Sequence, residues 1–457
     1  MKPVLIRGGR VVDPGSIDEI ADIIVDNGKI AAVESAAAGG LTSLSRKYSD
    51  LVIIDAQGKI VTPGLIDMHV HFREPGHEYK ETIQSGCLAA AHGGFTAVCT
   101  MPNTIPVNDD RKNTELVISR AQKAESARVY PVAAISKGME GRSLCDYEAL
   151  KHAGAVAVSD DGLPVVNSRL MRQALEDASR AGLLVMAHSE DLSLAAGGAM
   201  NEGPVAVRMG LPGIPNAAES ITVMRDIALC ELTHAPLHIM HVSTRESVRA
   251  LRDAKDRGVP VTAETAPHYF TLTDEAVEKY GTRAKMNPPL RSSVDRQAVR
   301  DGLADGTIDV IATDHAPHSV IEKQAPFAQA PNGIIGLETS LSLSLKLVLD
   351  GLIDITELIA LMTVNPARIL GLENGLAAGS RADITIIDTE KSYTVDANYF
   401  RSQGRNTPFD GWALKGRAVM AMVGGEIVFQ NSGNSKQERV NRKQERGKRK
   451  RKKGMDA

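Results

Sequence analysis

The stretch Leu65-Ile66-Asp67-Met68-His69-Val70-His71-Phe72-Arg73 places two histidines and an arginine at the end of a short apolar run. The run predicts a β-strand, and side chains two residues apart on a strand point to the same face. The chain contains eight such apolar runs, separated by spacers long enough for a helix. Eight strand–helix units predict a (β/α)8 barrel, and a doubly wound sheet is the competing interpretation. The other seven apolar runs are separated by helix-length spacers such as residues 81–92 and 169–181: residues 96–101, 129–135, 156–159, 183–188, 237–242, 261–264 and 310–313.

Both ends of the chain differ from this centre, because they contain short apolar runs separated by turn residues. The runs cover residues 4–6, 23–25, 30–33 and 52–54 near the start, and 382–387, 418–423 and 427–429 near the end. Neither end has enough strands to form a stable sheet alone. We therefore expect one small β-sandwich domain, built from residues 1–62 and 366–432, beside a barrel at residues 63–365. Residues 35–49 are expected to form a loop.

The composition is ordinary for a soluble globular protein, with 457 residues, 43% hydrophobic residues and a formal net charge of −3. It excludes a chain that is wholly disordered, collagen-like or coiled coil. The sequence has no uninterrupted apolar run of about 18 residues and no apolar leader, so we expect a cytoplasmic protein with no membrane partner. Four scattered cysteines are interpreted as buried, reduced thiols: Cys87, Cys99, Cys145 and Cys230.

The last residues of the chain concentrate positive charge. From Lys436 to Ala457 there are 11 Lys and Arg against 3 Asp and Glu, a local charge of +8, which leaves 42 basic and 53 acidic residues, a net −11, for the rest. A body this acidic predicts no specific nucleic-acid partner. We expect residues 433–457 to be a disordered tail, with an electrostatic tether to a partner, RNA or a membrane as the alternative.

Polar side chains follow several of the predicted barrel strands, at the end where barrel enzymes carry their chemistry. His69 and His71 share a strand face, and His188 and His241 end the fifth and sixth strands. Several imidazoles at one barrel mouth suit a divalent ion such as zinc, although a single histidine on a strand is more often a core residue. Asp314 ends the eighth strand, where a metal contact or proton transfer explains it better than a helix cap.

The fourth predicted strand ends in Ser159-Asp160-Asp161-Gly162. Adjacent residues of an extended segment point to opposite faces, so either Asp160 or Asp161 can face the barrel centre, but not both. The sequence Asp-Asp-Gly also favours a plain turn, which is the alternative interpretation for one of the two.

Several motifs, in order, resemble those of the bacterial class I dihydroorotases in the cyclic amidohydrolase superfamily. The resemblance extends from about residue 3 to residue 430 and implies a zinc site at the mouth of a barrel flanked by a β-sandwich. The motifs are Gly64 to Gly76 around the two histidines, Met101-Pro102-Asn103, Ser159 to Gly162, Asp314-His315-Ala316-Pro317-His318, Gly336-Leu337-Glu338-Thr339, Asn406-Thr407-Pro408-Phe409 and Gly416-Arg417.

The resemblance implies one metal held by His69, His71 and Asp314, and a second held by His188 and His241. Many relatives, including allantoinases and dihydropyrimidinases, bridge the two metals with a carboxylated lysine. The fourth strand of this chain has no lysine at its end and has the aspartate pair instead, as in class I dihydroorotases. The spacing to His188 favours Asp161 over Asp160 as the bridge. The sequence does not distinguish one zinc from two.

The family's reaction is the interconversion of N-carbamoyl-L-aspartate and L-dihydroorotate in the pyrimidine pathway to UMP. The resemblance implies that Asp314 takes a proton from the attacking water and delivers it to the departing nitrogen. Arg73, two residues beyond His71 and expected on the same strand face, suits the substrate carboxylate. The resemblance also implies substrate contacts by His71, Asn103, Asn287 and His318. Residues 318–333 are long and little patterned, and we expect them to form a lid whose Asn332-Gly333 backbone reaches the substrate, although family members often have an aromatic residue in place of Asn332.

Two alternatives stay open at this point. One is another cyclic amidase, such as an allantoinase or a hydantoinase, against which Arg73 and the aspartate pair argue. The other is a catalytically silent dihydroorotase-like subunit that scaffolds aspartate transcarbamoylase, which typically lacks the metal histidines that this chain retains. A homo-oligomer and an association with aspartate transcarbamoylase are compatible with the sequence, which does not reveal the oligomeric state.

Overall fold

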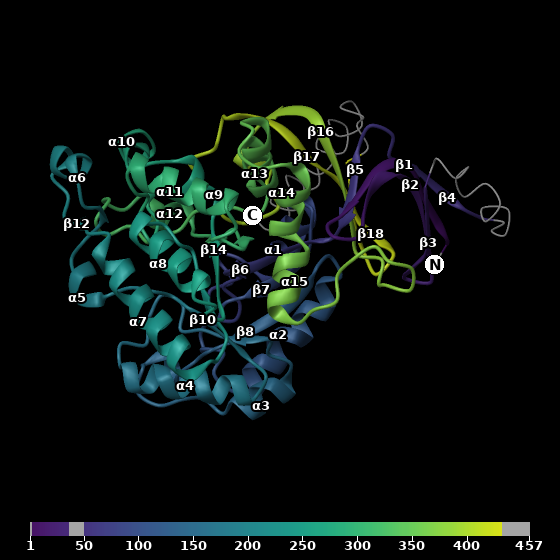
Figure 1. Ribbon diagram of the computed structural model, residues 1–457. Coiled ribbons are helices and arrows are strands. Elements are labelled where there is room, and N and C mark those ends of the chain that lie inside the picture. Colours follow the sequence, from purple (N-terminus) through teal and green to yellow (C-terminus); the bar gives the residue numbers. More distant parts are fainter. Residues whose placement is uncertain (1, 36–49, 432–457) are drawn as a thin grey trace, which may run out of the picture.

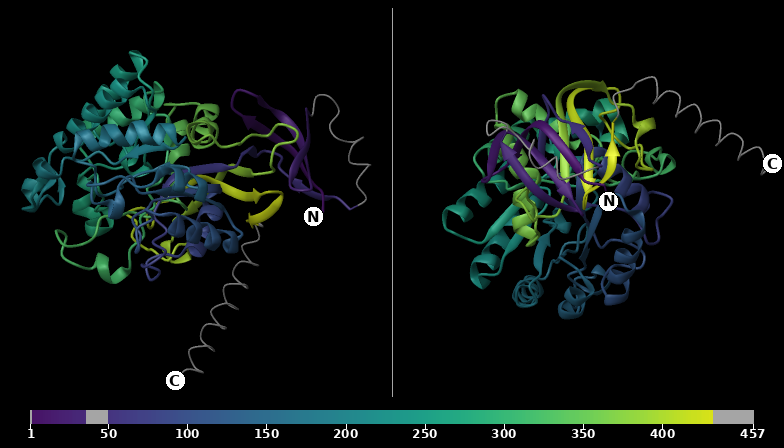
Figure 2. Two further views of the ribbon diagram at one scale, coloured as in Figure 1. Left: turned by 90° about the horizontal axis from the view of Figure 1, so that it is seen from below. Right: turned by 90° about the vertical axis from the view of Figure 1, so that its right-hand side faces the viewer.

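The computed structural model describes residues 2–35 and 50–431. Apart from Ser35, the loop expected at residues 35–49 lies outside the described residues, and so does the basic tail expected at 433–457. The described chain forms a barrel of parallel strands surrounded by helices, with a β-sheet at one side of it (Figure 1). Figure 2 shows that this sheet brings the start and the end of the described chain together.

Eight parallel strands form the barrel, and each pairs with its neighbour in chain order. The first and last strands meet where Val70 bridges His315 and the backbone N–H of His71 donates to the carbonyl of His315 at 2.9 Å. This closure confirms the (β/α)8 barrel, because a doubly wound sheet stays open at its edges. The strands are β6 (Leu65–Val70), β7 (Phe95–Thr100), β8 (Arg128–Ala133), β9 (Ala157–Val158), β10 (Leu184–Ala187), β13 (Leu237–Ile239), β14 (Val261–Thr265) and β15 (Val310–Ile311).

The helices around the barrel begin and end at residues suited to those positions. Thr82 accepts a hydrogen bond from the backbone N–H of Ser85 at the start of α1, which ends at Gly94 with a left-handed φ of 94°. The larger helices are α1 (Ile83–Gly93), α2 (Arg111–Ala124), α3 (Tyr147–Ala153), α4 (Ser168–Arg180), α7 (Ala217–Thr233), α8 (Arg245–Asp256), α11 (Ser293–Ala304), α13 (Ser340–Leu349), α14 (Ile355–Met362) and α15 (Val364–Leu370).

The loops that follow β10, β14 and β15 contain short helices and strands. These loops lie at the mouth of the barrel, where the candidate site is found. They include α5 (Leu192–Ala195), β11 (Met200–Asn201), α6 (Pro204–Met209), β12 (Gly213–Ile214), α9 (Pro267–Thr271), α10 (Glu275–Tyr280) and α12 (Val320–Lys323).

The second sheet contains strands from both ends of the chain, as the sequence predicted. Its two halves join where β5 pairs with β16, with Val61 opposite Ile386. Buried side chains from both halves, including Ile6, Ile23 and Ile384, share one apolar cluster. The order is β18-β17-β16-β5-β1-β2-β3, with β4 beside β1. The strands are β1 (Val4–Asp13), β2 (Ile17–Asp26), β3 (Lys29–Ser35), β4 (Val52–Asp55), β5 (Ile60–Pro63), β16 (Ile384–Thr394), β17 (Ala413–Val423) and β18 (Glu426–Gln430).

Two general predictions also concern the described residues. All four cysteines are buried and unpaired, which confirms their interpretation as free thiols in the core. Among the helices within residues 2–35 and 50–431, none has the length and apolar character needed to cross a membrane.

Candidate active site

The polar residues predicted at the strand ends converge at one mouth of the barrel. His69 lies on β6 and His71 just beyond it, while Asp161, His188 and His241 follow β9, β10 and β13. Each of these five residues is at most 5% exposed. The structure therefore brings together residues that are up to 172 positions apart in the chain.

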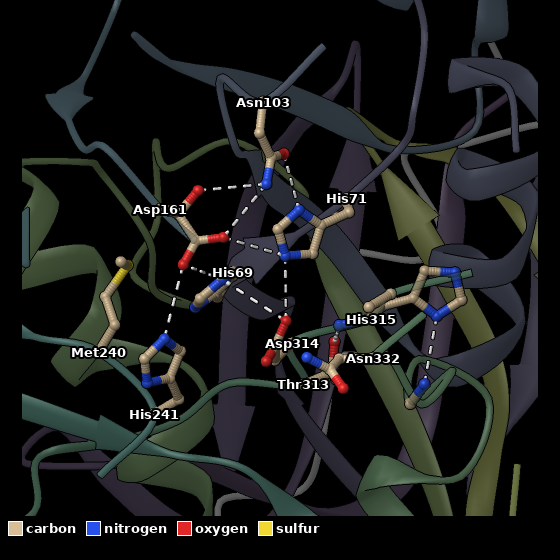
Figure 3. Close-up of polar contacts among 12 residues, drawn as sticks. His69, His71, Asn103, Asp161, Met240, His241, Thr313, Asp314, His315 and Asn332 are labelled. Atoms are coloured by element: carbon tan, nitrogen blue, oxygen red, sulfur yellow. Dashed lines mark hydrogen bonds and ion pairs between the residues drawn. The ribbon is translucent and has the colours of Figure 1, made fainter. Parts of the chain in front are cut away.

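Asp161 lies at the centre of this cluster (Figure 3). Its Oδ2 atom is 3.3 Å from His71 Nε2, and its Oδ1 atom is 3.7 Å from His69 Nε2. The same Oδ1 atom lies 3.3 Å from His188 Nδ1 and 3.5 Å from His241 Nε2. One carboxylate thus faces two pairs of imidazoles.

The neighbouring Asp160 points away from the cluster. Its Oδ1 atom accepts hydrogen bonds from the backbone N–H groups of Ile135 and Ser136 at 2.8 and 3.1 Å. Its Oδ2 atom accepts from the Ser136 hydroxyl at 2.5 Å. Asp160 therefore holds the loop after β8, and it is Asp161 that faces the histidines.

Asp314 follows β15, the last strand of the barrel, and reaches the same cluster. Its Oδ1 atom is 3.1 Å from His71 Nε2 and 3.6 Å from His69 Nε2. Asp314 has a left-handed φ of 47°, an uncommon and costly conformation for a non-glycine residue. Burial alone would raise the pKa of Asp314, but the charges of His69 and His71 draw it below its usual value, which favours the carboxylate.

The donor set fits a divalent metal ion. Two groups of three residues each bring their ligand atoms within 4.8 Å of one another: His69, His71 and Asp161, and Asp161, His188 and His241. The His69 Nε2 atom is buried and has no hydrogen-bond partner among the described residues. A buried polar atom without a partner is costly, and imidazole nitrogens with carboxylate oxygens are common ligands of zinc and similar ions.

Two oxygen acceptors orient the paired histidines. The Nδ1 atom of His69 lies 2.7 Å from Glu264 Oε1, and Nδ1 of His71 lies 2.9 Å from Asn103 Oδ1. Each ring that donates its Nδ1 proton in this way presents an Nε2 lone pair to the cluster. Glu264 is 1% exposed, and His238 Nε2 lies 3.3 Å from its other oxygen. The sequence signal for Glu264 was an acidic residue ending the apolar run 261–264, but its partner His69 could not be inferred.

Replacing Glu264 with glutamine is expected to weaken metal binding without unfolding the protein. The amide oxygen can still accept from His69 Nδ1, but the negative charge that strengthens the imidazole as a ligand is lost. Removing such an outer partner typically lowers metal affinity about 10- to 100-fold. Competition with a chromophoric chelator measures this change directly. The milder control is Thr262→Val, which removes the hydroxyl that contacts His238 Nδ1 and the Leu237 carbonyl. Unchanged affinity in a folded Glu264→Gln protein would contradict this role.

Arg73 lies at the mouth, although not where the strand pattern placed it. The prediction of a shared strand face with His71 was wrong, because β6 ends at Val70 and Arg73 has a left-handed φ of 59°. Its Nε atom donates to the carbonyl of Pro317 at 3.2 Å, and its Nη2 atom lies 3.4 Å from His318 Nε2. The guanidinium therefore reaches the loop after β15.

The other predicted substrate residues border the same space. The amide nitrogen of Asn103 lies 3.4 Å from Asp161 Oδ2, and that of Asn287 lies 3.4 Å from Glu190 Oε2. The carbonyl of Asn332 accepts a hydrogen bond from His318 Nε2 at 2.8 Å. These contacts bring Asn103, His318 and Asn332 around the mouth, while Asn287 approaches it through Glu190.

Gly333 contributes in a different way from that expected. Its N–H donates to the carbonyl of Lys285 at 2.9 Å, and its carbonyl accepts from Lys323 and Asn406, so both backbone groups are engaged within the protein. Its φ is 150°, and an added Cβ would lie 2.5 Å from the carbonyl oxygen of Ala316 and 2.8 Å from His318 Cδ2. The missing side chain thus leaves room for His318.

Comparison with solved structures defines the class of protein. L-hydantoinase (dihydropyrimidinase) from Arthrobacter aurescens superposes with a TM-score of 0.84 and is 27% identical in sequence, covering 94% of this chain and 96% of that one. A closed parallel barrel with a β domain and a histidine–aspartate cluster at its mouth defines a metal-dependent amidohydrolase.

Sequence relatives narrow this class further. Residues 58–247 match the family model described as dihydro-orotase-like. The dihydroorotase of Desulforapulum autotrophicum is 56% identical over 93% of this chain and 99% of its own length. That of Syntrophus aciditrophicus is 54% identical over the same shares. The chain belongs to the dihydroorotase family.

Proposed function

We propose that this chain catalyses the reversible cyclisation of N-carbamoyl-L-aspartate to L-dihydroorotate in pyrimidine biosynthesis, with one or two zinc ions held at the barrel mouth. The observation that carries the proposal is the position of Asp161 between two pairs of histidines. His69, His71 and Asp314 would hold one ion, His188 and His241 the other, and Asp161 would be shared. An aspartate at this position matches the class I dihydroorotases and not the lysine-bridged hydantoinases.

The chain's own residues supply the proton transfer of the reaction. When bound, zinc would lower the pKa of a coordinated water to about 7 and polarise the amide carbonyl. In ring opening, Asp314 accepts the proton of the attacking water and then delivers it to the ring nitrogen as the amide bond breaks. In ring closure the same carboxylate removes a proton from the carbamoyl nitrogen as that nitrogen attacks the side-chain carboxyl carbon, and then gives the proton to the departing oxygen, which leaves as water. Burial of the site excludes bulk water, which strengthens these electrostatic contacts.

The substrate carries a carboxylate outside the reacting amide, and the mouth offers a cation to receive it. Arg73 follows β6, and its guanidinium lies beside His318 of the loop after β15. This planar group can bind a carboxylate through two parallel hydrogen bonds. Asn103, Asn287 and His318 would provide neutral hydrogen-bonding groups around the ring. Asn103 would act in addition through His71, whose Nδ1 it faces.

Replacing Arg73 with methionine is expected to raise KM for L-dihydroorotate by about 10- to 100-fold, because the loss of one charged hydrogen-bonding partner typically costs that much binding. Steady-state kinetics in the ring-opening direction measure this change. The value of kcat should fall less than kcat/KM, since the metal ligands are untouched. An unchanged KM would assign the carboxylate to another cation.

A substrate panel tests the proposed activity against the rival amidases. Metal-loaded protein should open L-dihydroorotate at least about 100-fold faster, by kcat/KM, than hydantoin, dihydrouracil or allantoin, because the latter lack the carboxylate that Arg73 receives. Preference for any of these three would overturn the proposal. Absence of all turnover in a folded, metal-loaded protein would favour the silent scaffold for aspartate transcarbamoylase.

We also propose the assignment of the chain to a composite β domain at residues 1–62 and 366–432, a barrel at 63–365 and a basic tail at 433–457. The sheet that contains both β5 and β16 supports the first of these. A cytoplasmic location fits the biosynthetic role of the reaction. Size-exclusion chromatography with light scattering, alone and with aspartate transcarbamoylase, tests for a homo-oligomer and for that association.

A further inference from the structure

Two short segments after β15 carry His318 and Asn332, which are expected from the sequence to contact the substrate. Residues 316–318 include His318, and residues 332–333 include Asn332 and Gly333. They touch through the hydrogen bond from His318 Nε2 to the Asn332 carbonyl. At their base they also pair through the Ala316 N–H, which donates to the Ile334 carbonyl at 3.0 Å. The tips of the segments need further partners to hold one geometry, because neither tip lies in a helix or a strand.

Asn406 supplies such a partner from a distant part of the chain. It is 3% exposed and precedes β17, 88 residues after His318. Its Oδ1 atom accepts from the backbone N–H of His318 at 3.0 Å. Its Nδ2 atom donates to the carbonyls of Ala316 and Gly333, both at 2.9 Å. One amide side chain therefore joins both segments and uses both of its donor hydrogens.

Lys323 on α12 holds the second segment from the other side. The residue is 7% exposed, and its Nζ atom lies 2.9 Å from the Pro331 carbonyl and 3.1 Å from that of Gly333. The Lys285 carbonyl lies 3.4 Å away. Burying an ammonium group among backbone carbonyls is costly, and the burial lowers the pKa of Lys323 to about 7. Asn406 and Lys323 thus converge on one acceptor, the Gly333 carbonyl.

We infer that Asn406 and Lys323 are positioning residues that clamp the substrate loop, holding His318 and Asn332 in the geometry that receives the substrate beside Arg73. This inference rests on the proposed function. The clamp lies outside the histidine–aspartate cluster, so its loss should weaken substrate binding while the metal site stays intact. The backbone pairing of Ala316 with Ile334 keeps the loop attached when the clamp is removed.

The test uses Asn406→Asp, an isosteric change that places an oxygen against the carbonyls of Ala316 and Gly333. Lys323→Met provides the second variant. The matched control is Asn365→Asp. The Nδ2 atom of Asn365 also donates to a backbone carbonyl, that of Asp309 at 2.9 Å, but Asp309 comes before β15 whereas the clamped loop follows it. Zinc content, melting temperature, kcat and KM for L-dihydroorotate are measured for the full-length metal-loaded protein and each variant.

We expect KM to rise about 10- to 100-fold in both clamp variants, because each leaves a buried polar group unpaired. Zinc content should be unchanged, kcat should stay within about threefold, and the control should keep the original KM. An unchanged KM in Lys323→Met, or in a folded Asn406→Asp protein, would overturn the inference. Equal losses of kcat and zinc in both variants would also overturn it, as they indicate a purely structural role. An original protein that binds zinc but leaves L-dihydroorotate intact would instead refute the proposed function.

Discussion

Asp314→Asn is expected to lower kcat for L-dihydroorotate by roughly 10²- to 10⁴-fold, the range by which a positioned general acid–base group accelerates a reaction. The amide cannot accept the proton of the attacking water, although its oxygen can still face His71 Nε2, 3.1 Å from the present carboxylate. Zinc should therefore be retained at least in part. Turnover and metal content are measured on the same preparation.

Asp309→Asn is the matched control for this experiment, because Asp309 lies immediately before the same strand, β15. Its carboxylate accepts from Lys255 Nζ at 2.6 Å and from the Ala263 N–H at 2.9 Å, at the end of the barrel away from the cluster. Its loss should lower the melting temperature and leave kcat nearly unchanged. Substantial residual activity in Asp314→Asn would remove Asp314 from the proton-transfer role.

Asp161→Asn is expected to lower both metal content and turnover. Asp161 is common to the two groups of ligands, so weakening it affects both metal positions. The amide is neutral and offers one acceptor oxygen in place of two. We expect the protein to lose at least one metal equivalent, or to bind metal more weakly by more than the roughly 10- to 100-fold that is typical when a hydrogen-bond partner of a ligand is removed. The value of kcat should fall at least about 100-fold, because both metal positions depend on this carboxylate. Elemental analysis after dialysis, together with kinetics, measures both quantities.

The adjacent Asp160 offers a close control. Asp160→Asn retains an oxygen for the Ile135 and Ser136 N–H groups, and its amide can donate to the Ser136 hydroxyl. It should therefore keep its metal and most of its activity. If Asp160→Asn lost the metal and Asp161→Asn kept it, the assignment of the shared carboxylate would be reversed.

The sequence predicted the repeated strand–helix units of the barrel, but not the backbone conformation of the loops that follow β6 and β15. Apolar runs separated by helix-length spacers were sufficient to predict the barrel. Because side chains two residues apart on a strand share a face, the sequence also placed His69 and His71 together. The same periodicity failed for Arg73, because the chain leaves the strand after Val70 and turns with a positive φ. Strand β15 likewise ends at Ile311, before the left-handed Asp314.

The partners of the site residues lay beyond what spacing could reveal. Glu264 faces His69 across 195 positions of sequence, and Asn406 faces His318 across 88. Such contacts follow from barrel closure and from the return of the chain to the β domain, which no local pattern encodes. The spacing to His188 favoured Asp161 over Asp160 but did not decide between them, since the turn after β9 determines which carboxylate faces the cluster.

The most direct measurement is a zinc titration into chelator-treated protein, with ring opening of L-dihydroorotate followed at each addition. We expect the stripped protein to be folded and inactive, and turnover to rise with zinc until one or two equivalents per chain are bound. Full turnover by protein that contains no metal, or zinc bound tightly with no turnover of L-dihydroorotate, would contradict this expectation.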